Sequence, residues 1–360
     1  MKIIDQNLYY TEHRGTASHI GSVYGEELRL QMKEVLNRTW KNVEKRFNAQ
    51  LISTAIGKMS EAFRHHYPYL WEEMEGICSG ASLSMKELQI HLFSAGIRLF
   101  EDDGCSDILF PSSDVGPLLG KTHDATTPNL SLMVVRLIQL ESLYDVLCVT
   151  RIDGISTVTG LNERGLAVGE ASLHFQTTNK NGTVRNLLLR PLLHECRDVH
   201  EAVQFLEDHP PSNAGFHFAL LDRAGNGAIV ERSPTEQNVR WSQGEAVFCT
   251  NHTATPSMRR KEKSRGKEGD RNSDTRYEHL TRLTSNENVV ASLDSLKNIL
   301  TFHDSEGGIC QHGDPDFEGE DSSFYPLFTQ RAFINIVQSK TLAVSNGPPC
   351  CNDFFEFRMT

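Results

Sequence analysis

The stretch FEDDGCSDILF, Phe100–Phe110, places one cysteine between acidic residues and an apolar run. Cys105 follows the acids at positions 101–103 and then Gly104. Burying a structural thiol beside those carboxylates would be costly, because buried charges need partners. The setting therefore predicts a cleavage site or a reaction centre.

The residues alone leave three interpretations of Cys105 open. It is a structural thiol, a nucleophile paired with one of the 15 histidines, or a residue that becomes a new amino terminus. No histidine carries a family signature, so the second interpretation is unspecific. In the third, the thiol attacks the Gly104 carbonyl, where glycine does not crowd the approach, and water resolves the thioester. The freed α-amino group, with a reference pKa of roughly 7.7–8.0, then acts as general base for the thiol.

The elements around Cys105 change type at this point of the chain. Residues 1–104 are predicted to be mostly helical, because apolar residues recur at spacings of three and four in 25–47 and 55–100. Ser84 and Glu87 have the spacing of a capping box. We expect the last of these helices to end just before Gly104.

After Cys105, short β-type runs alternate with a few helical segments. Asn162 to Gly165 and Asp222 to Gly227 have the composition of hairpin turns. The pattern predicts an α+β chain with packed antiparallel sheets and covering helices. The expected strands lie in 131–140, 144–152, 155–175, 216–233, 245–252 and 333–349, and the expected helices in 187–198, 199–209 and 283–303.

Composition and charge exclude several classes of protein. The chain has 360 residues, of which 38% are hydrophobic and 23% charged, as in a globular protein with a large core. A net charge of -11 argues against a general nucleic-acid binder. The sequence has neither a long apolar run nor an apolar signal at its start, and its eight cysteines are irregularly spaced, so we expect a cytoplasmic protein without membrane association or disulfides.

One segment differs in composition from its surroundings. Residues 259–271 hold seven basic residues against three acids, without apolar periodicity. We therefore expect residues 257–274 to be a flexible surface insertion. Docking of a phosphate or an acidic partner is the alternative interpretation.

An ordered set of motifs resembles the acyl-coenzyme A:6-aminopenicillanic acid acyltransferase family (peptidase family C45), whose members are self-cleaving N-terminal-nucleophile hydrolases. The motifs run in order along nearly the whole chain. They are GTASHIGSVYGEEL (15–28), DGCSD (103–107), GKTHDA (120–125), GLNERGLAVG (160–169), CTNH (249–252) and GPP (347–349).

The resemblance implies a role for four residues. Cys105 would be the nucleophile and new amino terminus, and Gly104 would supply the scissile carbonyl. Asp124 would hold the freed amine, and the side-chain amide of Asn251 would help to form the oxyanion hole. From composition alone, Asp124 is a turn or cap residue and Asn251 a strand-end residue.

The implied fold is a four-layer αββα sandwich with the Cys105 strand in a central sheet. Its helical fragment, 1–104, and its β-rich fragment, 105–360, would remain associated as one folded unit after cleavage. The implied reaction is hydrolysis or transfer of the acyl group of a small N-acyl amine or N-acyl amino acid through a Cys105 thioester. An acyl-coenzyme A is a possible donor, and no cofactor or metal is expected.

Two departures from the family pattern concern the substrate more than the nucleophile. The chain reads Gly-Lys-Thr-His-Asp at 120–124, where relatives commonly have an apolar or aromatic residue and an asparagine. It also has Glu170 near the position where relatives tend to have an asparagine. A carboxylate pointing into the pocket at Glu170 would favour a substrate with a cationic amine.

Two other classes of function are kept as alternatives. One is a binding protein of the same fold that never cleaves itself. The other is a metal-binding module, because Cys249 and His252, and likewise Cys310 and His312, have soft side chains at short spacings. Neither spacing is a standard zinc motif.

Overall fold

The structure is a computed structural model of the whole chain. It describes residues 1–5, 7–46, 49–94, 104–127, 129–179, 182–211, 213–285, 290–304, 307–313 and 326–359.

The larger sheet of the described chain has nine strands in the order β1-β2-β5-β6-β7-β8-β9-β10-β11. Neighbours are antiparallel except for β2 and β5, which are parallel. The strands are β1 Lys2–Asp5, β2 Leu8–Gly15, β5 Met133–Leu140, β6 Val146–Arg151, β7 Thr157–Asn162, β8 Ala167–Thr178, β9 Asn213–Leu221, β10 Gly227–Arg232 and β11 Gln237–Trp241.

The smaller main sheet has six described strands in the order β12-β3-β4-β15-β16-β17, all antiparallel. Cys105 lies in β3, between β12 and β4. The strands are β3 Gly104–Phe110, β4 Leu118–Ala125, β12 Val247–Cys249, β15 Phe328–Ile336, β16 Thr341–Ser345 and β17 Phe354–Arg358. A separate short hairpin consists of β13 His303–Asp304 and β14 Gly307–Gly308.

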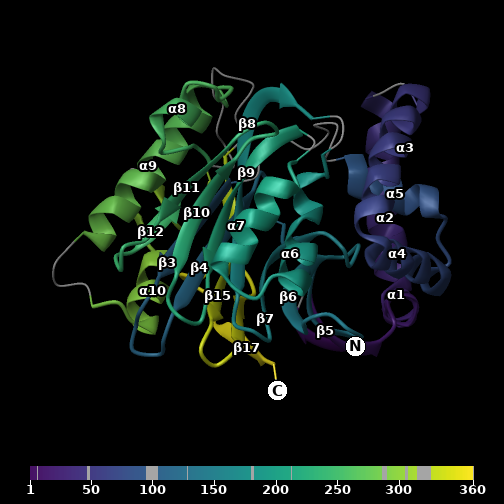
Figure 1. Cartoon of the computed structure of the whole chain (residues 1–360), viewed down its shortest axis with the longest axis horizontal. Coiled ribbons are helices and arrows are strands. Elements are labelled where there is room, and N and C mark those ends of the chain that lie inside the picture. The colour runs from purple at the N-terminus through teal and green to yellow at the C-terminus, as the bar shows by residue number, and fades with distance from the viewer. Residues whose placement is uncertain are drawn as a thin grey trace.

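Helices cover the outer face of each sheet (Figure 1). Those associated with the nine-stranded sheet are α1 Ala17–Glu27, α2 Arg29–Arg46, α3 Ala49–His66, α4 Pro68–Ala81, α5 Met85–Ser94, α6 Leu189–Glu195 and α7 Val199–Asp208, with a short 3-10 turn at Arg185–Leu187. Those near the six-stranded sheet are α8 Pro256–Arg259, α9 Lys267–Thr284 and α10 Leu293–Leu300.

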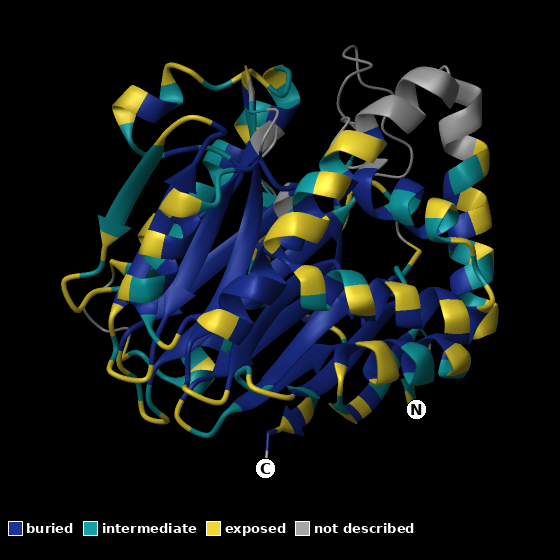
Figure 2. Ribbon diagram, turned by 45° about the vertical axis from the view of Figure 1, so that its right-hand side comes forward, coloured by how far each residue is buried: buried dark blue, intermediate teal, exposed yellow. Residues whose placement is uncertain are grey.

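The hydrophobic cores define four layers. One core joins α1–α7 to the nine-stranded sheet, a second fills the space between the two sheets, and a third joins the six-stranded sheet to α9 and α10. Figure 2 shows the sheets as almost wholly buried, with exposed residues along the outer faces of the helices. The predicted α+β class and αββα sandwich are therefore confirmed.

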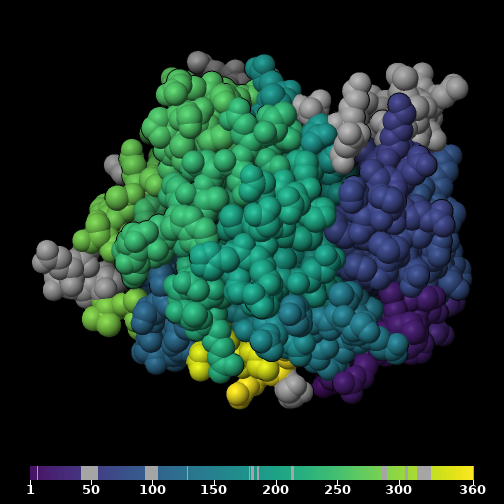
Figure 3. Space-filling model, in the orientation of Figure 1, coloured from purple at the N-terminus to yellow at the C-terminus, as the bar shows by residue number. Residues whose placement is uncertain are grey.

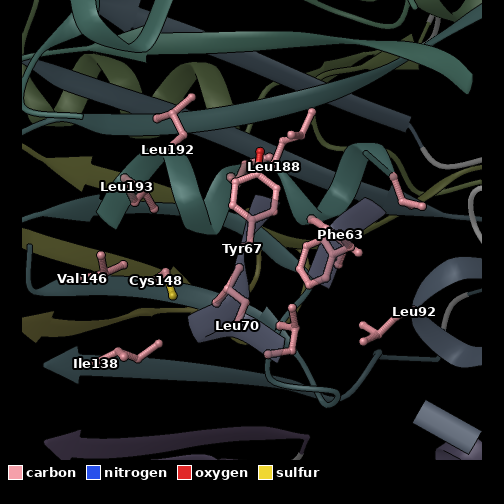
Figure 4. Close-up of a cluster of buried hydrophobic side chains, with 14 of the residues drawn as sticks. Phe63, Tyr67, Leu70, Leu92, Ile138, Val146, Cys148, Leu188, Leu192 and Leu193 are labelled. Atoms are coloured by element: carbon pink, nitrogen blue, oxygen red, sulfur yellow. The ribbon is translucent and has the colours of Figure 1, made fainter. Parts of the chain in front are cut away.

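The first core is built on close helix packing. A Cβ atom at Gly21 of α1 would lie 2.1 Å from the Glu73 backbone oxygen of α4, and one at Gly76 would lie 2.2 Å from that of Ser18, so these glycines let the two helices touch. Figure 4 shows a neighbouring part of this core, which includes Tyr67, the residue before α4, together with Leu70 of α4 and Cys148 of β6. In Figure 3 the N-terminal helices form one flank of the molecule.

Most of the predicted elements are present in the structure. The hairpin turns lie where expected, with Gly165 and Gly225 at positive φ. The Ser84 capping box is also made, since Glu87 N donates to Ser84 Oγ at 3.3 Å and Ser84 N donates to Glu87 Oε2 at 2.7 Å. The helical fragment differs at its start, because β1 and β2 belong to the nine-stranded sheet. Strand β1 pairs with β2, and the partner that places β2 in the sheet, β5, lies far away in sequence, so helical periodicity could not indicate this pairing. The predicted helix end before Gly104 lies outside the described residues.

None of the described helices combines the length and the apolar character that crossing a bilayer requires.

Candidate active site

The site is built at the first two residues of β3. In the register with β4, Gly104 lies opposite Asp124 and Cys105 opposite His123. A Cβ atom at position 104 would lie 2.9 Å from Asp124 Oδ2 and 2.6 Å from Leu327 Cδ1. Only glycine therefore fits beside this carboxylate without a shift of the neighbouring side chains.

Asn251 completes the other side of β3. Strand β12 pairs Cys249 with Asp107 and then ends, so Asn251 stands where a partner of Cys105 would follow. Its side-chain Oδ1 accepts a hydrogen bond from Cys105 N at 2.9 Å. Its Nδ2 donates to the backbone oxygen and to Oγ of Ser172, both at 3.1 Å. A side chain, instead of a strand backbone, thus holds the N–H of the candidate nucleophile.

Asp124 is positioned by β15. Thr329 Oγ1 donates to Asp124 Oδ1 at 2.7 Å, and both residues are buried. The Cys105 side chain faces the space between the sheets. Asp124 lies opposite Gly104, the neighbour of Cys105 in β3, and neighbouring residues of a strand point to opposite faces. The Asp124 side chain therefore lies on the other face of the sheet, toward α9. The two groups approach the Gly104–Cys105 peptide from its two sides.

Charged groups surround the thiol on the inner face. Lys121 Nζ lies 3.6 Å from Asp107 Oδ2 and donates to the Glu170 backbone oxygen, and all three residues are buried. Burial raises the pKa of the Cys105 thiol to about 12, although the Lys121 ammonium acts in the opposite direction. Burial also raises the pKa of Asp107 to about 6. Burial alone would lower the pKa of Lys121, but the negative charges of Asp107, the Cys105 thiolate and Glu170 together raise that pKa, so the ammonium stays charged near neutral pH. The thiol of the uncut chain is therefore protonated at neutral pH beside a buried cation.

Glu170 is buried near this centre. Its backbone oxygen accepts from Lys121 Nζ, and after burial its negative charge is among the causes that raise the pKa of the Cys105 thiol. The conventional thiol–histidine pairing also has a candidate, because His123 Nδ1 lies 4.0 Å from Cys105 Sγ. That separation is at the outer limit for a hydrogen bond to sulfur.

Arg276 of α9 is the main site residue that sequence reasoning missed. Its guanidinium donates to the Cys105 backbone oxygen at 2.5 Å, to Ser106 Oγ at 2.9 Å and to Asn251 Oδ1 at 2.8 Å. Burial lowers the pKa of Arg276, and Asp124 partly offsets the effect. Arg276 thus cross-links the nucleophile residue and the asparagine from the helix layer.

Little in the sequence marks Arg276. It lies 171 residues after Cys105 and has no motif around it. The two serines that hold Asn251 have no sequence signal either. The Ser172 backbone oxygen accepts a hydrogen bond from Asn251 Nδ2, and Ser273 Oγ accepts one from Asn251 N at 2.9 Å. Lys121 belongs to the quoted GKTHDA motif, and its position opposite Asp107 follows once β3 and β4 are paired.

The basic segment 257–274 differs from the expected loop. It contains most of α8 and the first turns of α9, and Met258 and Ser273 are buried. Its charges have local partners: Arg259 contacts Asp274 at 3.1 Å, and Lys261 contacts Glu236 at 2.5 Å. Charge balance from neighbouring elements allows this segment to fold as helix against the site.

The two candidate metal pairs have different environments. Cys249 is fully buried in the core between the sheets, and His252 Nδ1 contacts Ser273 Oγ at 2.9 Å. Within the described residues, neither belongs to a group of potential metal ligands, whereas Cys310 and His312 do.

A small cavity of about 160 Å³ borders the site. Its lining includes Arg276, Arg271, Glu268 and Gln311. A larger cavity of about 520 Å³ lies between α2, α5 and residues 127 and 129–132, with Arg38, Glu34 and Arg151 among its polar residues.

Comparison with known proteins gives one family match. The family described as acyl-coenzyme A:6-aminopenicillanic acid acyl-transferase matches residues 112–319, more than half of the chain. No significant match arises among curated protein sequences.

Several solved structures are similar to the chain at low identity. A mutant conjugated bile acid hydrolase from Clostridium perfringens has a TM-score of 0.46 at 15% identity, over 71% of this chain and 97% of the other. A penicillin V acylase from Agrobacterium tumefaciens has 0.43 at 15%, over 71% and 86%. An N-acylethanolamine-hydrolyzing acid amidase orthologue from Caenorhabditis elegans has 0.43 at 13%, over 65% and 93%.

Proposed function

Because the chain belongs to the acyl-coenzyme A:6-aminopenicillanic acid acyl-transferase family, we propose that it is a self-processing cysteine enzyme acting on non-peptide C–N bonds. It transfers the acyl group of a small N-acyl amine or N-acyl amino acid to water or to an amine. The observation that carries the proposal is the hydrogen bond from Cys105 N to Asn251 Oδ1, next to Gly104 and Asp124.

The first reaction is cleavage of the chain. The Cys105 sulfur bonds to the Gly104 carbonyl carbon, the Gly104–Cys105 C–N bond breaks, and the nitrogen leaves as the α-amine of Cys105. Water then attacks the thioester, which frees the thiol and gives Gly104 a carboxylate. Because the pKa of the Cys105 thiol is about 12, the thiol loses its proton during attack, and the departing Cys105 nitrogen gains a proton in the same step; the Lys121 ammonium stabilises the thiolate that forms.

The second reaction repeats this chemistry on a substrate. The neutral Cys105 amine takes the thiol proton, and the thiolate attacks the substrate carbonyl to give an acyl-thioester and a free amine. Asp124 orients the amine of Cys105. Asn251 is the oxyanion donor, which requires one of its two N–H groups to exchange Ser172 for the developing oxyanion.

One feature favours a substrate with a cationic amine. Glu170 supplies negative charge near the sulfur, which would attract a protonated amine on the departing part of the substrate. An acyl-coenzyme A is the alternative donor, and the two fragments remain associated in the active form.

The proposal is tested by mass spectrometry of the purified protein. The processed enzyme gives fragments 1–104 and 105–360, and incubation with N-acyl amines of increasing acyl length gives an acyl adduct on the Cys105 peptide with release of the amine. An intact chain that hydrolyses these amides at full rate would overturn the processing step. An intact chain that binds them without turnover would favour the non-processing binding protein.

A further inference from the structure

A second group of cysteine and histidine side chains lies away from the candidate active site. The group consists of His303, Cys310, His312 and Cys350 and is called here the Cys310 cluster. One ligand atom from each residue lies within 4.8 Å of all the others. Cys310 is buried, whereas the other three residues are exposed.

The spacing of these atoms matches a tetrahedral metal site. Zinc bonds of about 2.3 Å to sulfur and about 2.0–2.1 Å to nitrogen give tetrahedral edges of about 3.8 Å between two sulfurs and about 3.6 Å between sulfur and nitrogen. Cys310 Sγ and Cys350 Sγ are 3.7 Å apart. His312 Nε2 lies 3.5 Å from the Cys310 sulfur and 3.2 Å from the Cys350 sulfur. Three of the six edges therefore have nearly the lengths that zinc requires, and His303 needs to close by no more than about 1.5 Å, as a side-chain rotation can achieve.

The fourth ligand is oriented by its own backbone. His303 Nδ1 lies 3.0 Å from the Thr301 backbone oxygen, a geometry in which Nδ1 donates. That bond leaves Nε2 as the nitrogen with a free lone pair. Histidine ligands of metals commonly donate their other ring N–H to a carbonyl in this way.

We propose that His303, Cys310, His312 and Cys350 bind one Zn²⁺ as a structural site. Two thiolates and two imidazoles in a tetrahedron are the ligand set that zinc prefers, and four protein ligands leave no open position for catalysis. Both thiols give up their protons to solvent when the metal binds. This proposal replaces the sequence-based expectation of no metal, and it joins the predicted Cys310–His312 pair to two residues that no spacing rule connects.

The bound metal would tie the C-terminal turn to the support of the active site. Cys350 lies between β16 and β17, His303 lies in β13, and Cys310 and His312 follow β14. Between two of the ligands, Gln311 N donates to Thr329 Oγ1 at 2.7 Å, and the same hydroxyl donates to Asp124 Oδ1. The metal would therefore fix the strand that positions Asp124, without touching the reacting atoms.

A disulfide is the competing fate of the two thiols. The sulfur separation of 3.7 Å is far longer than a disulfide bond of about 2.0 Å, and all eight cysteines are free. A disulfide would not involve His303 and His312, whereas a metal would bind both.

The test is metal analysis of the full-length protein purified without chelator from zinc-supplemented cells. Wild type is expected to hold about one zinc per chain, and after exchange into Co²⁺ to show the visible bands and thiolate charge-transfer absorption of a tetrahedral cobalt site. Cys350→Ser and His303→Asn should each lose at least about nine-tenths of the zinc during dialysis against a moderate chelator. Cys351→Ser is the matched control, because its sulfur is exposed and adjacent but outside the cluster, and it should keep the metal.

A second readout is thermal stability. Chelation should lower the Tm of wild type and of Cys351→Ser, and it should leave the Tm of Cys350→Ser unchanged. The proposal is overturned by wild-type protein that holds less than about a tenth of an equivalent of zinc and develops no cobalt absorption. A Cys310–Cys350 disulfide in freshly isolated protein, or equal zinc content in Cys350→Ser and Cys351→Ser, would overturn it as well.

Discussion

Cys105 and Cys148 are both buried thiols beside buried cationic side chains, and they differ in how their backbones are held. Cys148 lies in the middle of β6, paired with Arg136 of β5 on one side and Gly160 of β7 on the other. Cys105 is the second residue of β3, pairs with β4 on one side, and is held by the Asn251 side chain on the other.

The charges around the two thiols also differ in their pairing. Near Cys148, the carboxylate of Glu73 forms two ion pairs. Arg136 Nη1 lies 2.8 Å from Oε1, and Arg190 Nη2 lies 2.9 Å from Oε2. Burial alone would raise the pKa of Glu73, but the two arginines hold it below its ordinary value. We call Glu73, Arg136 and Arg190 the Glu73 network. It joins α4 and α6 to the nine-stranded sheet.

Thiol acidity does not separate the two cysteines. Burial raises the pKa of both, and nearby cations offset the effect only in part. The difference lies in the preceding peptide: Gly104 brings a carbonyl without side-chain crowding next to Asp124, whereas the peptide before Cys148 lies inside a doubly paired strand. The reactivity that we propose for Cys105 therefore rests on the backbone around it more than on the charge near its sulfur.

The strongest test of this contrast removes each thiol in turn. Cys105→Ala should remain an intact chain without turnover, and Cys105→Ser should cleave slowly, because a hydroxyl is a poorer nucleophile at neutral pH. Cys148→Ala, the matched buried control, should process and turn over normally. Intact-mass measurement and an amide hydrolysis assay report both outcomes, and a processed Cys105→Ala chain would refute the assignment.

Substitution in the Glu73 network should lower the free energy of unfolding without changing turnover. Glu73→Gln leaves two buried arginines without a carboxylate and should lower the free energy of unfolding by about 3–5 kcal/mol. Glu75→Gln, at an exposed position of the same helix, should change it by less than about 0.5 kcal/mol. Urea unfolding measures both, and turnover per folded Glu73→Gln molecule should match wild type. A loss of turnover in the folded fraction would show that the Glu73 network is coupled to the candidate active site.

Replacing Asn251 should reduce turnover strongly, but less than replacing Cys105. Asn251→Ala should reduce turnover roughly 100- to 1000-fold in processed protein, the usual cost of one oxyanion donor. Asn251→Asp keeps an oxygen that accepts from Cys105 N but loses the N–H donor, so its turnover should be reduced as much as that of Asn251→Ala. Steady-state kinetics decide the matter: an aspartate variant within about tenfold of wild type would assign Asn251 to holding the amine alone.

Local signals in the sequence marked the residues of the candidate site that the structure brings together. Gly104 and Cys105 stand out against the acids before them, and Asp124 and Asn251 lie in short motifs that the structure brings to the same end of β3. The alternation of strands and helices after Cys105 was also sufficient for the α+β class and, with the family resemblance, for the four layers.

Features that depend on distant packing could not be predicted. Arg276 reaches Cys105 across 171 residues of chain because α9 packs on the six-stranded sheet. Strand β2 reads as part of a helical region until its parallel partner β5 is known. Cys350 likewise joins Cys310 through the turn after β16, and no local periodicity encodes that approach.

The smallest expected effect concerns the pH dependence of turnover, and it distinguishes the charges on the two sides of the Cys105 amine. That amine must be neutral to accept the thiol proton, so turnover should rise as pH passes upward through its pKa, which is roughly 7.7–8.0 when unperturbed. Asp124 favours the charged amine and raises this pKa, whereas the Arg276 guanidinium, which shares Asn251 Oδ1 with Cys105 N, favours the neutral amine and lowers it.

The two charges therefore predict opposite shifts of the acid limb. Asp124→Asn should move it by about one unit to lower pH, and Arg276→Gln by about one unit to higher pH. Both variants are assayed with a free Cys105 terminus, made by co-expressing 1–104 with 105–360 behind a removable methionine, so that a failure to self-cleave does not obscure the result. His123→Asn is the third arm, since His123 Nδ1 lies 4.0 Å from the sulfur. If the limb moves only in His123→Asn, the base is the histidine and Cys105 acts as a conventional nucleophile; opposite shifts in the other two variants assign the base to the residue's own amine.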